Sequence, residues 1–358
     1  MRIHNFSAGP CILPQEVMRQ ASEAVLDFNG MGLGLIEISH RSKEFVAVMD
    51  EARALVKELL NLPDRFEVLY LQGGASLAFL TAAYNFLPQD GKAAYLDTGT
   101  WAAKAIKEAR RLGAVDVVGS SKESNYNHIP TGWSAPSDAA YLHFTTNNTI
   151  FGTQFHDLPS GGDVPLIADM SSDIFSRAFD PEPYHLIYAG AQKNMGPAGT
   201  VLYIVDKDVL GRTGRDIPAY LDLGVHIDKD SMFNTPPVFA VYTSMLTLRW
   251  LRDLGGVEEI SRRNMAKAAA IYGEIDRNGL FEGHATVESR SQMNATFRLK
   301  DEAKHAEAFN KLWAEAGISG LKGHRSVGGY RASMYNALPL ESVEALVEVM
   351  QELERTHG

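Results

Sequence analysis

A lysine surrounded by small residues is the first candidate for covalent chemistry in this chain. Lys193 follows an apolar run at residues 185–189, which is expected to form a strand, and it precedes Gly196, Pro197 and Gly199. Backbone that wraps closely around a single amine suits an amine that must bond to the carbonyl carbon of a cofactor. An ordinary surface lysine in a glycine-rich turn is the alternative, and Lys193 alone does not exclude it.

Asp169 favours the chemical interpretation over that alternative. It ends the apolar run at residues 165–168, and ligands of α/β folds collect at the carboxyl ends of such strands. A carboxylate and a later lysine on neighbouring strand ends are the two partners that pyridoxal phosphate requires. The acid keeps the pyridine nitrogen protonated, and the amine holds the aldehyde. The pair therefore predicts a pyridoxal phosphate site in which Lys193 and Asp169 are the catalytic residues.

Further positions near expected strand ends suit such a cofactor. Gly73 and Gly74 precede Ser76 at the start of an expected helix, where free N–H groups favour a phosphate, although Ser76 could equally cap a plain turn. Trp101 could stack on a flat ring, but a half-buried tryptophan of the core is the more common case. The loop hydroxyl of Thr149 says little alone. The chain has no Walker A spacing and no Gly-x-Gly-x-x-Gly pattern with a following acid, so nucleotide cofactors are disfavoured.

Two His-Arg pairs and one further arginine predict a site for an anionic substrate. They are His40-Arg41, His324-Arg325 and Arg331. Guanidinium groups that are held in place suit a bidentate grip on carboxylate and phosphate, so several of them would suit a phosphorylated 2-oxo acid. The alternative is that Arg41 and Arg325 form ordinary ion pairs on the surface.

Alternating strands and helices would position these residues. Short apolar runs alternate with helical patterns from about residue 66, which predicts an α/β fold with a mostly parallel sheet covered on both faces. From residue 237 the pattern becomes helical and then mixed, as in an α+β domain. We therefore expect a large domain at residues 15–256 and a small C-terminal domain at residues 257–358 that also includes residues 1–14. Strands are expected at 66–71, 93–97, 115–118, 139–144, 165–168, 185–189, 200–205, 286–298 and 330–335, and helices at 76–86, 100–112, 238–254, 257–278, 303–316 and 340–356.

The composition argues against several kinds of partner. The formal net charge is −10 over 358 residues, which disfavours nucleic acid and anionic membranes as main partners. Cys11 is the only cysteine, so neither an intrachain disulfide nor a cysteine-rich metal site is expected, and the histidines show no metal-ligand spacing. The first residues lack the apolar core of a signal peptide, and no run is long enough to span a membrane. We therefore expect a protein of the cytoplasm.

Five long segments carry a resemblance to a known family. They read NFSAGP at residues 5–10, EISHRSKEF at 37–45, YAGAQKNMGPAG at 188–199, SMFNTPP at 231–237 and KGHRSVGGYRAS at 322–333. On these segments the chain resembles the phosphoserine aminotransferases over essentially its whole length. The resemblance implies a pyridoxal-phosphate enzyme of fold type I in the class-V aminotransferase family. Such enzymes have a large domain with a mostly parallel sheet of the seven-stranded type and a smaller α+β C-terminal domain.

The resemblance also implies how the chain would hold pyridoxal 5'-phosphate. Lys193 would bind the cofactor covalently, and Asp169 would face its ring nitrogen. The other implied contacts are Trp101 on the ring, Thr149 near the phenolic oxygen, Ala75, Ser76 and Gln192 at the phosphate, and Asn234 and Thr235 reaching that phosphate from the other subunit. The family's site is therefore complete only in a homodimer. Some members have arginine at the position of Ser76, where it helps to hold the phosphate of the substrate, so one contact to the substrate phosphate is expected to be absent or supplied elsewhere.

The implied substrate contacts come from the His-Arg pairs. Arg331 would bind the α-carboxylate, while Arg41, from the partner subunit, would hold the distal anion together with His40, His324 and Arg325. The implied reaction transfers the amino group of L-glutamate to 3-phosphohydroxypyruvate, which gives 2-oxoglutarate and O-phospho-L-serine for serine biosynthesis. In bacteria the resemblance extends to 3-hydroxy-2-oxo-4-phosphooxybutanoate, which gives 4-phosphooxy-L-threonine for pyridoxine biosynthesis.

Three other functions fit parts of the pattern. A serine–pyruvate or alanine–glyoxylate type aminotransferase of the same fold would not need the two His-Arg pairs. A non-catalytic binding protein would be expected to have lost the lysine or the aspartate, and both are present. A cysteine desulfurase needs a reactive thiol on a late loop, whereas Cys11 lies near the start and is expected to be structural.

Overall fold

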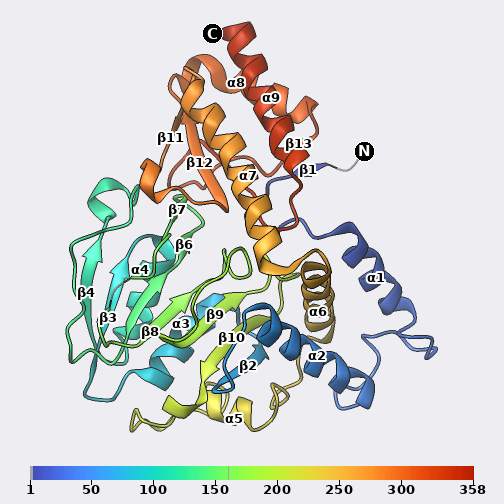
Figure 1. Cartoon of the computed structure of the whole chain (residues 1–358), viewed down its shortest axis with the longest axis vertical. Coiled ribbons are helices and arrows are strands. Elements are labelled where there is room, and N and C mark those ends of the chain that lie inside the picture. Colours follow the sequence, from blue (N-terminus) through green and yellow to red (C-terminus); the bar gives the residue numbers. More distant parts are fainter. Residues whose placement is uncertain (1–2, 160) are drawn as a thin grey trace.

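A seven-stranded sheet is the framework of the larger part of the molecule (Figure 1). In the computed structural model, which describes residues 3–159 and 161–358, the strand order is β2-β10-β9-β8-β5-β3-β4. Strand β10 pairs antiparallel with β2 and β9, whereas the remaining pairs are parallel. The predicted α/β class and mostly parallel sheet are therefore confirmed. The strands are β2 (Phe66–Leu71), β3 (Lys92–Asp97), β4 (Ala114–Ser120), β5 (Leu142–Thr145), β8 (Leu166–Asp169), β9 (Tyr184–Gly190) and β10 (Val201–Asp206).

The central strands are apolar runs because helices cover both faces of the sheet. All six residues of β10 are buried, and alternate residues of a strand enter different cores. Val68 and Tyr70 of β2 pack with residues of α1, α2 and α6, whereas Leu69 between them packs with residues of α3 and α4. Strands that are buried on both faces read as continuous apolar sequence, which is why these runs could be recognised without the structure.

The helices on the two faces begin and end at local signals in the sequence. Helix α2 (Lys43–Leu59) starts at Ser42, whose side chain accepts a hydrogen bond from the N–H of Phe45. Its buried residues Phe45, Met49, Ala52 and Val56 recur at the spacing of one helical face. The others are α1 (Gln15–Leu26) and α6 (Val238–Asp253) on the face of α2, α3 (Gly74–Phe86) and α4 (Thr100–Ala109) on the opposite face, and the short α5 (Leu223–Ile227), η1 (Lys122–Ser124) and η2 (Lys207–Val209).

A smaller layer of sheet and helices lies above the seven-stranded sheet in Figure 1. Its antiparallel sheet has the order β11-β12-β14, and the N-terminal strand β1 pairs with β13. Phe6 and Ile12 share a core with residues between Ala268 and Leu353. The domain boundaries at residues 14 and 256 remain predictions. The elements are β1 (His4–Asn5), α7 (Gly256–Arg277), β11 (Phe281–Gly283), η3 (Val287–Ser289), β12 (Asn294–Leu299), α8 (Glu302–Glu315), β13 (Ile318–Ser319), β14 (Tyr330–Ser333) and α9 (Leu340–His357).

The structure corrects one expected strand substantially. Residues 286–298 were expected to be extended throughout, but η3 occupies Val287–Ser289 and β12 begins only at Asn294. The reason is a local turn in which the hydroxyl of Ser291 accepts hydrogen bonds from the N–H groups of Met293 and Asn294. Such side-chain bonds compete with strand pairing. The strand expected at 139–144 is also shorter than expected, because β5 begins at Leu142.

None of the helices within the described residues is long and apolar enough to cross a membrane.

Candidate active site

A cavity of about 350 Å³ lies at the carboxyl ends of the central strands. Thr145 ends β5, Asp169 ends β8, and Lys193 follows β9. The volume is within the range of small-molecule and cofactor pockets. The residues that were predicted for the site and that line this cavity are Ala75, Ser76, Trp101, Thr149, Asp169, Gln192, Lys193, His324 and Arg331.

Lys193 presents its amine to the cavity. Its Nζ atom donates a hydrogen bond to Thr149 Oγ1 over 2.8 Å. Burial lowers the pKa of the amine to about 8, and the positive charge of Arg331 adds to this effect while Asp169 opposes it. On the side away from the cavity, the Cys11 thiol donates to the Lys193 carbonyl. The burial of this thiol raises its pKa to about 12, which fits a structural cysteine and not a reactive thiolate.

Asp169 places a buried carboxylate on another side of the cavity. It is 3% exposed, and the N–H of Ser171 donates to its Oδ1 over 2.9 Å. Burial raises the pKa of this carboxyl, whereas the bonds from Ser171 and the charge of Lys193 lower it. A buried carboxylate is stabilised by a cation beside it. Asp169 therefore fits a protonated ring nitrogen in the cavity.

The N-terminus of α3 forms an anion-binding corner of the same cavity. Gly73 precedes the helix in a left-handed conformation, with a φ of 97°, which glycine adopts without steric cost. The N–H of Leu77 bonds to the Gly73 carbonyl, so the N–H groups of Gly74, Ala75 and Ser76 come before the first bond of the helix. Free N–H groups and the positive end of the helix dipole suit a phosphate.

Trp101 lies at the second position of α4 and lines the cavity. Its indole Nε1 is buried without a hydrogen-bond partner among the described residues. The Lys104 ammonium lies 4.3 Å from the centre of the indole ring, an arrangement that favours a fixed ring orientation. Trp101 therefore fits a residue that covers a flat ligand.

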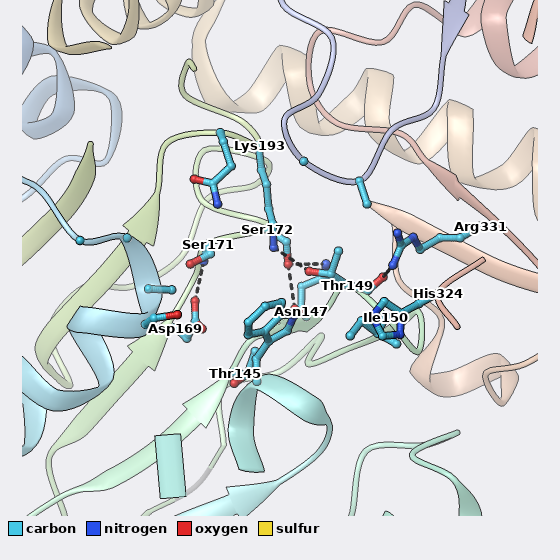
Figure 2. Close-up of a pocket in the computed structure, with 18 residues that line it drawn as sticks. Thr145, Asn147, Thr149, Ile150, Asp169, Ser171, Ser172, Lys193, His324 and Arg331 are labelled. Carbon is cyan, nitrogen blue, oxygen red and sulfur yellow. Dashed lines mark hydrogen bonds between the residues drawn. The ribbon is translucent and has the colours of Figure 1, made fainter. Parts of the chain in front are cut away.

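Arg331 and His324 line the cavity on the side away from Asp169 (Figure 2). Arg331 Nη1 donates to the carbonyl oxygen of Thr149 over 3.3 Å, and its Nε is buried without a partner among the described residues. His324 shares a hydrogen bond with Ser326. Partial burial lowers the pKa of His324, as do the nearby charges of Arg331, Arg325 and Lys104. An unpaired guanidinium edge in a partly buried pocket suits a carboxylate.

The other predicted site residues lie outside this cavity. Arg325, Arg41, Asn234 and Thr235 are exposed, and His40 is half-buried. The carbonyl of Thr235 accepts a hydrogen bond from the side chain of Gln72, the residue before Gly73. The roles of these five residues remain predictions, and those of Arg41, Asn234 and Thr235 depend on a second subunit.

Several cavity residues were missed in the sequence. Thr145, Asn147, Ser171 and Ser172 line the cavity but were not singled out. Ser171 and Ser172 follow Asp169 directly, so the end of that strand was the available signal for them. Asn147 lies in the polar run after the strand that contains His143, and only its three-dimensional contacts distinguish it from its neighbours.

Comparison with known proteins agrees with this geometry. The model of the family described as aminotransferase class-V matches residues 3–346. The phosphoserine aminotransferase of Flavobacterium psychrophilum is 63% identical over 355 residues, which cover 99% of each chain. The solved phosphoserine aminotransferase of Bacillus circulans subsp. alkalophilus is 45% identical, with a TM-score of 0.96 over 100% of this chain and 99% of that one. The PLP-bound phosphoserine aminotransferase of Trichomonas vaginalis is 36% identical, with a TM-score of 0.92 over 98% of this chain and 100% of the other.

The strand-end lysine and aspartate, the helix N-terminus and the arginine of the smaller layer thus occur in a chain whose relatives match it from end to end. The chain belongs to the class-V aminotransferase family and, within it, to the phosphoserine aminotransferases.

Proposed function

We propose that the protein transfers the amino group of L-glutamate to 3-phosphohydroxypyruvate, giving 2-oxoglutarate and O-phospho-L-serine. The observation that carries this proposal is the meeting of Lys193 and Arg331 at Thr149. Lys193 Nζ contacts the hydroxyl of Thr149, and Arg331 contacts its carbonyl. A group that moves protons and a group that binds carboxylates are thereby held beside one another, as an amino-acid substrate requires.

The residues of the cavity fit pyridoxal 5'-phosphate. Lys193 would hold it covalently through Nζ, Asp169 would face its ring nitrogen, and Trp101 would cover its ring. Its phosphate would lie at the N-terminus of α3, where Ala75 and Ser76 present N–H groups and Gln192 lies alongside. When bound, this cofactor supplies a carbonyl carbon that accepts the amino group and a ring that takes up the electron pair left on the substrate.

The protein supplies binding, orientation and proton movement. Arg331 would bind the α-carboxylate of either substrate and so fix the α-carbon relative to Lys193. Burial lowers the pKa of the Lys193 amine to about 8, close to neutral pH, so Nζ would be able both to accept a proton from the α-carbon and to return one. Asp169 would remain ionised beside a ring cation, because the two charges stabilise one another.

The distal anion of each substrate would be bound further from Asp169. His324 lies in the cavity beside Arg331, and Arg325 follows it in the sequence. We infer that His40 and Arg41 of the partner subunit complete this subsite. The same subsite would bind the phosphate of 3-phosphohydroxypyruvate and the side-chain carboxylate of glutamate.

A homodimer is part of this proposal. Large apolar side chains are exposed near both segments that would reach the partner's site, namely Leu26, Met31, Leu33, Ile36, Phe233 and Phe239. Exposed apolar side chains of this size in both segments support the proposal that another chain covers them. We place the enzyme in the cytoplasm, where the single thiol of Cys11 would stay reduced.

Substrate preference tests the proposal against the serine–pyruvate or alanine–glyoxylate alternative. A phosphorylated 2-oxo acid carries about three negative charges near neutral pH, since the second phosphate pKa is about 6. An amino-group acceptor without a phosphate would leave the cationic hydrogen-bond donors of the distal subsite unpaired. Such a loss typically costs several kcal/mol of binding free energy. We expect kcat/KM for 3-phosphohydroxypyruvate to exceed that for pyruvate or glyoxylate by at least about 10³-fold.

Two results would bear on the distal subsite and on the function itself. Arg325→Ala should reduce the ratio between phosphorylated and unphosphorylated acceptors and should affect glutamate turnover less than Arg331→Ala does. Equal or better turnover of pyruvate or glyoxylate would overturn the proposed function.

A further inference from the structure

A completely buried asparagine joins the two layers of the molecule behind the cavity. Asn294 of β12 is 0% exposed. Its Oδ1 accepts a hydrogen bond from Asn147 Nδ2 over 2.8 Å. Its Nδ2 donates to Ser333 Oγ over 2.9 Å and to the Tyr335 hydroxyl over 3.3 Å. The side-chain oxygen of Asn294 therefore bonds to the larger part of the molecule, and its side-chain nitrogen bonds to the smaller part.

Through Asn147, Asn294 is connected directly to the lining of the cavity. Asn147 belongs to β6 (Asn147–Asn148), which pairs with β7 (Thr153–Gln154) beneath β11 and β12 (Figure 1). Asn147 Nδ2 also donates to Ser172 Oγ over 2.8 Å, and the Ser172 hydroxyl donates back to the Asn147 carbonyl. Both residues line the cavity (Figure 2). Asn147 is also two residues before Thr149, which accepts the hydrogen bond from Lys193.

On its other side, the Nδ2 group of Asn294 bonds to the strand that carries Arg331 and to the residue Tyr335 just after it. In the antiparallel pairing of β12 with β14, Asn294 lies opposite Ser333 and Thr296 lies opposite Arg331. The hydroxyl of Thr296 donates to the Ile150 carbonyl over 3.3 Å. The strand that carries Arg331 is thus connected, through β12, to the loop that carries Thr149.

The same loop packs against the β12 backbone. Gly152 has a φ of 72°, and a Cβ atom added to it would lie 2.7 Å from the Asn294 carbonyl oxygen. The N–H of Ser291 donates to the Gly152 carbonyl over 2.9 Å. Residues 147–152 are therefore held by Asn294 of β12 at one end and by Ser291, just before β12, at the other, and within the described residues Asn294 is the one side chain that bonds to Asn147, Ser333 and Tyr335 together.

We propose that Asn294 is a positioning residue for substrate binding, which fixes Arg331 at a set distance from Lys193 through the loop at residues 147–152. The inference rests on the proposed role of Arg331 as the carboxylate-binding group. An amide is required because one side chain must accept from one partner and donate to two others. Because Asn294 is 0% exposed, removal of its amide leaves buried polar groups without this partner, and that loss is costly. As a consequence, the Lys193 side and the Arg331 side of the substrate pocket are connected rigidly.

The test compares Asn294→Ala with a matched buried asparagine. Asn278 is 1% exposed and donates to Glu274 and to the Met350 carbonyl, away from the cavity. In the cofactor-loaded enzyme, Asn294→Ala should raise the apparent dissociation constant for L-glutamate by about tenfold in single-turnover experiments, with a smaller effect on the rate at saturation. Asn278→Ala should lower the melting temperature comparably but leave the glutamate constant within about twofold.

A double-mutant cycle separates positioning from general destabilisation. Arg331→Lys should by itself raise the dissociation constant for glutamate. If Asn294 acts through Arg331, adding Asn294→Ala to Arg331→Lys should raise that constant by less than about twofold. Full additivity, or an equal effect of Asn278→Ala on glutamate binding, would overturn the inference and leave the proposed function intact. An Arg331→Lys enzyme with unchanged glutamate binding would overturn the role of Arg331 and the inference together.

A second readout does not depend on turnover. In the cofactor-free protein, Asn294→Ala should increase hydrogen exchange in both residues 147–152 and residues 330–333, whereas Asn278→Ala should not. Unchanged exchange in either segment would contradict the connection. If Asn294→Ala does not fold, Ser333→Ala removes one of its bonds and should change glutamate binding and exchange in the same direction by smaller amounts.

Discussion

Lys193 Nζ lies 2.8 Å from the hydroxyl oxygen of Thr149, and the backbone carbonyl of the same threonine accepts a hydrogen bond from Arg331. Thr149 is 4% exposed, and it lines the same cavity as Lys193 and Arg331. Its side chain and its backbone therefore serve two different functional groups, which permits the two contacts to be tested separately.

Thr149→Val should reduce turnover more than it weakens substrate binding. The substitution removes the hydroxyl that orients Lys193 but keeps the carbonyl that contacts Arg331. We expect kcat to fall by about tenfold, which corresponds to about 1.4 kcal/mol, with a smaller change in KM for glutamate. Thr149→Ser keeps the hydroxyl and should restore most of kcat in steady-state assays. Equal losses in the two variants would assign the effect to packing.

Asp169→Asn should lower turnover by at least about 10²-fold, a typical loss for an essential electrostatic group. The amide cannot provide the negative charge that would keep a ring nitrogen protonated. Asp173→Asn is the matched control, because Asp173 is also buried, at 6% exposed, but does not line the cavity. Steady-state assays should therefore show a much smaller loss for Asp173→Asn. Near wild-type turnover of Asp169→Asn would mean that another acid faces the ring.

Mixed dimers should reveal whether the site is shared. Lys193→Ala and Arg41→Ala chains should each be inactive or nearly so, but a mixed dimer would contain one intact site. After random subunit exchange, activity should recover to about a quarter of the wild-type value. A mixture of Lys193→Ala with Asp169→Asn should not recover, since both residues belong to the same chain's site. Failure of the first mixture, with exchange demonstrated, would place Arg41 in its own subunit's site.

The buried amine of Lys267 should give the stability of the protein a defined pH dependence. Its Nζ donates to the carbonyls of Met334 and Tyr335, and burial lowers its pKa from 10.5 to about 7. Between these two values the unfolded chain binds more protons than the folded one, so the free energy of unfolding should rise with pH. Below about pH 7 both states are protonated, and the contribution to the slope disappears.

Lys267→Met should flatten that rise by up to about 1.4 kcal/mol per pH unit. Urea unfolding at several pH values within the window measures the slope. The exposed Lys311, on α8, provides the control, and Lys311→Met should leave the slope unchanged. A Lys267→Met protein with the wild-type slope would mean that the folded protein keeps this amine at its ordinary pKa.

The parts of the fold and site that could be predicted were those with local causes. Continuous apolar runs marked β8, β9 and β10 within one or two residues, because burial on both faces leaves no polar positions. Lys193 and Asp169 were identifiable because each ends or follows such a run. Helix α3 began two residues earlier than expected, since glycines at its N-terminus hide the start of a helical pattern.

The parts that could not be predicted depend on contacts between distant residues. Asn147 and Asn294 are separated by 147 positions. The residues next to them in the sequence do not indicate that the two side chains form a buried hydrogen bond. The late start of β12 depends on bonds that the Ser291 hydroxyl accepts from the N–H groups of Met293 and Asn294, and the same hydroxyl donates to Asn147. Arg331 was a candidate for anion binding from the sequence, but its specific role on the α-carboxylate was implied only by the resemblance, because an arginine in a strand is usually a surface residue.

The attachment of the cofactor to Lys193 tests the proposed function most directly, since every other role is defined relative to that amine. The protein should be purified with pyridoxal phosphate, reduced with borohydride, digested, and mapped by peptide mass. We expect the mass of the reduced cofactor on Lys193 and its absence after incubation with excess L-glutamate before reduction. A cofactor-derived mass on any other lysine, or none on Lys193, would contradict the proposed attachment.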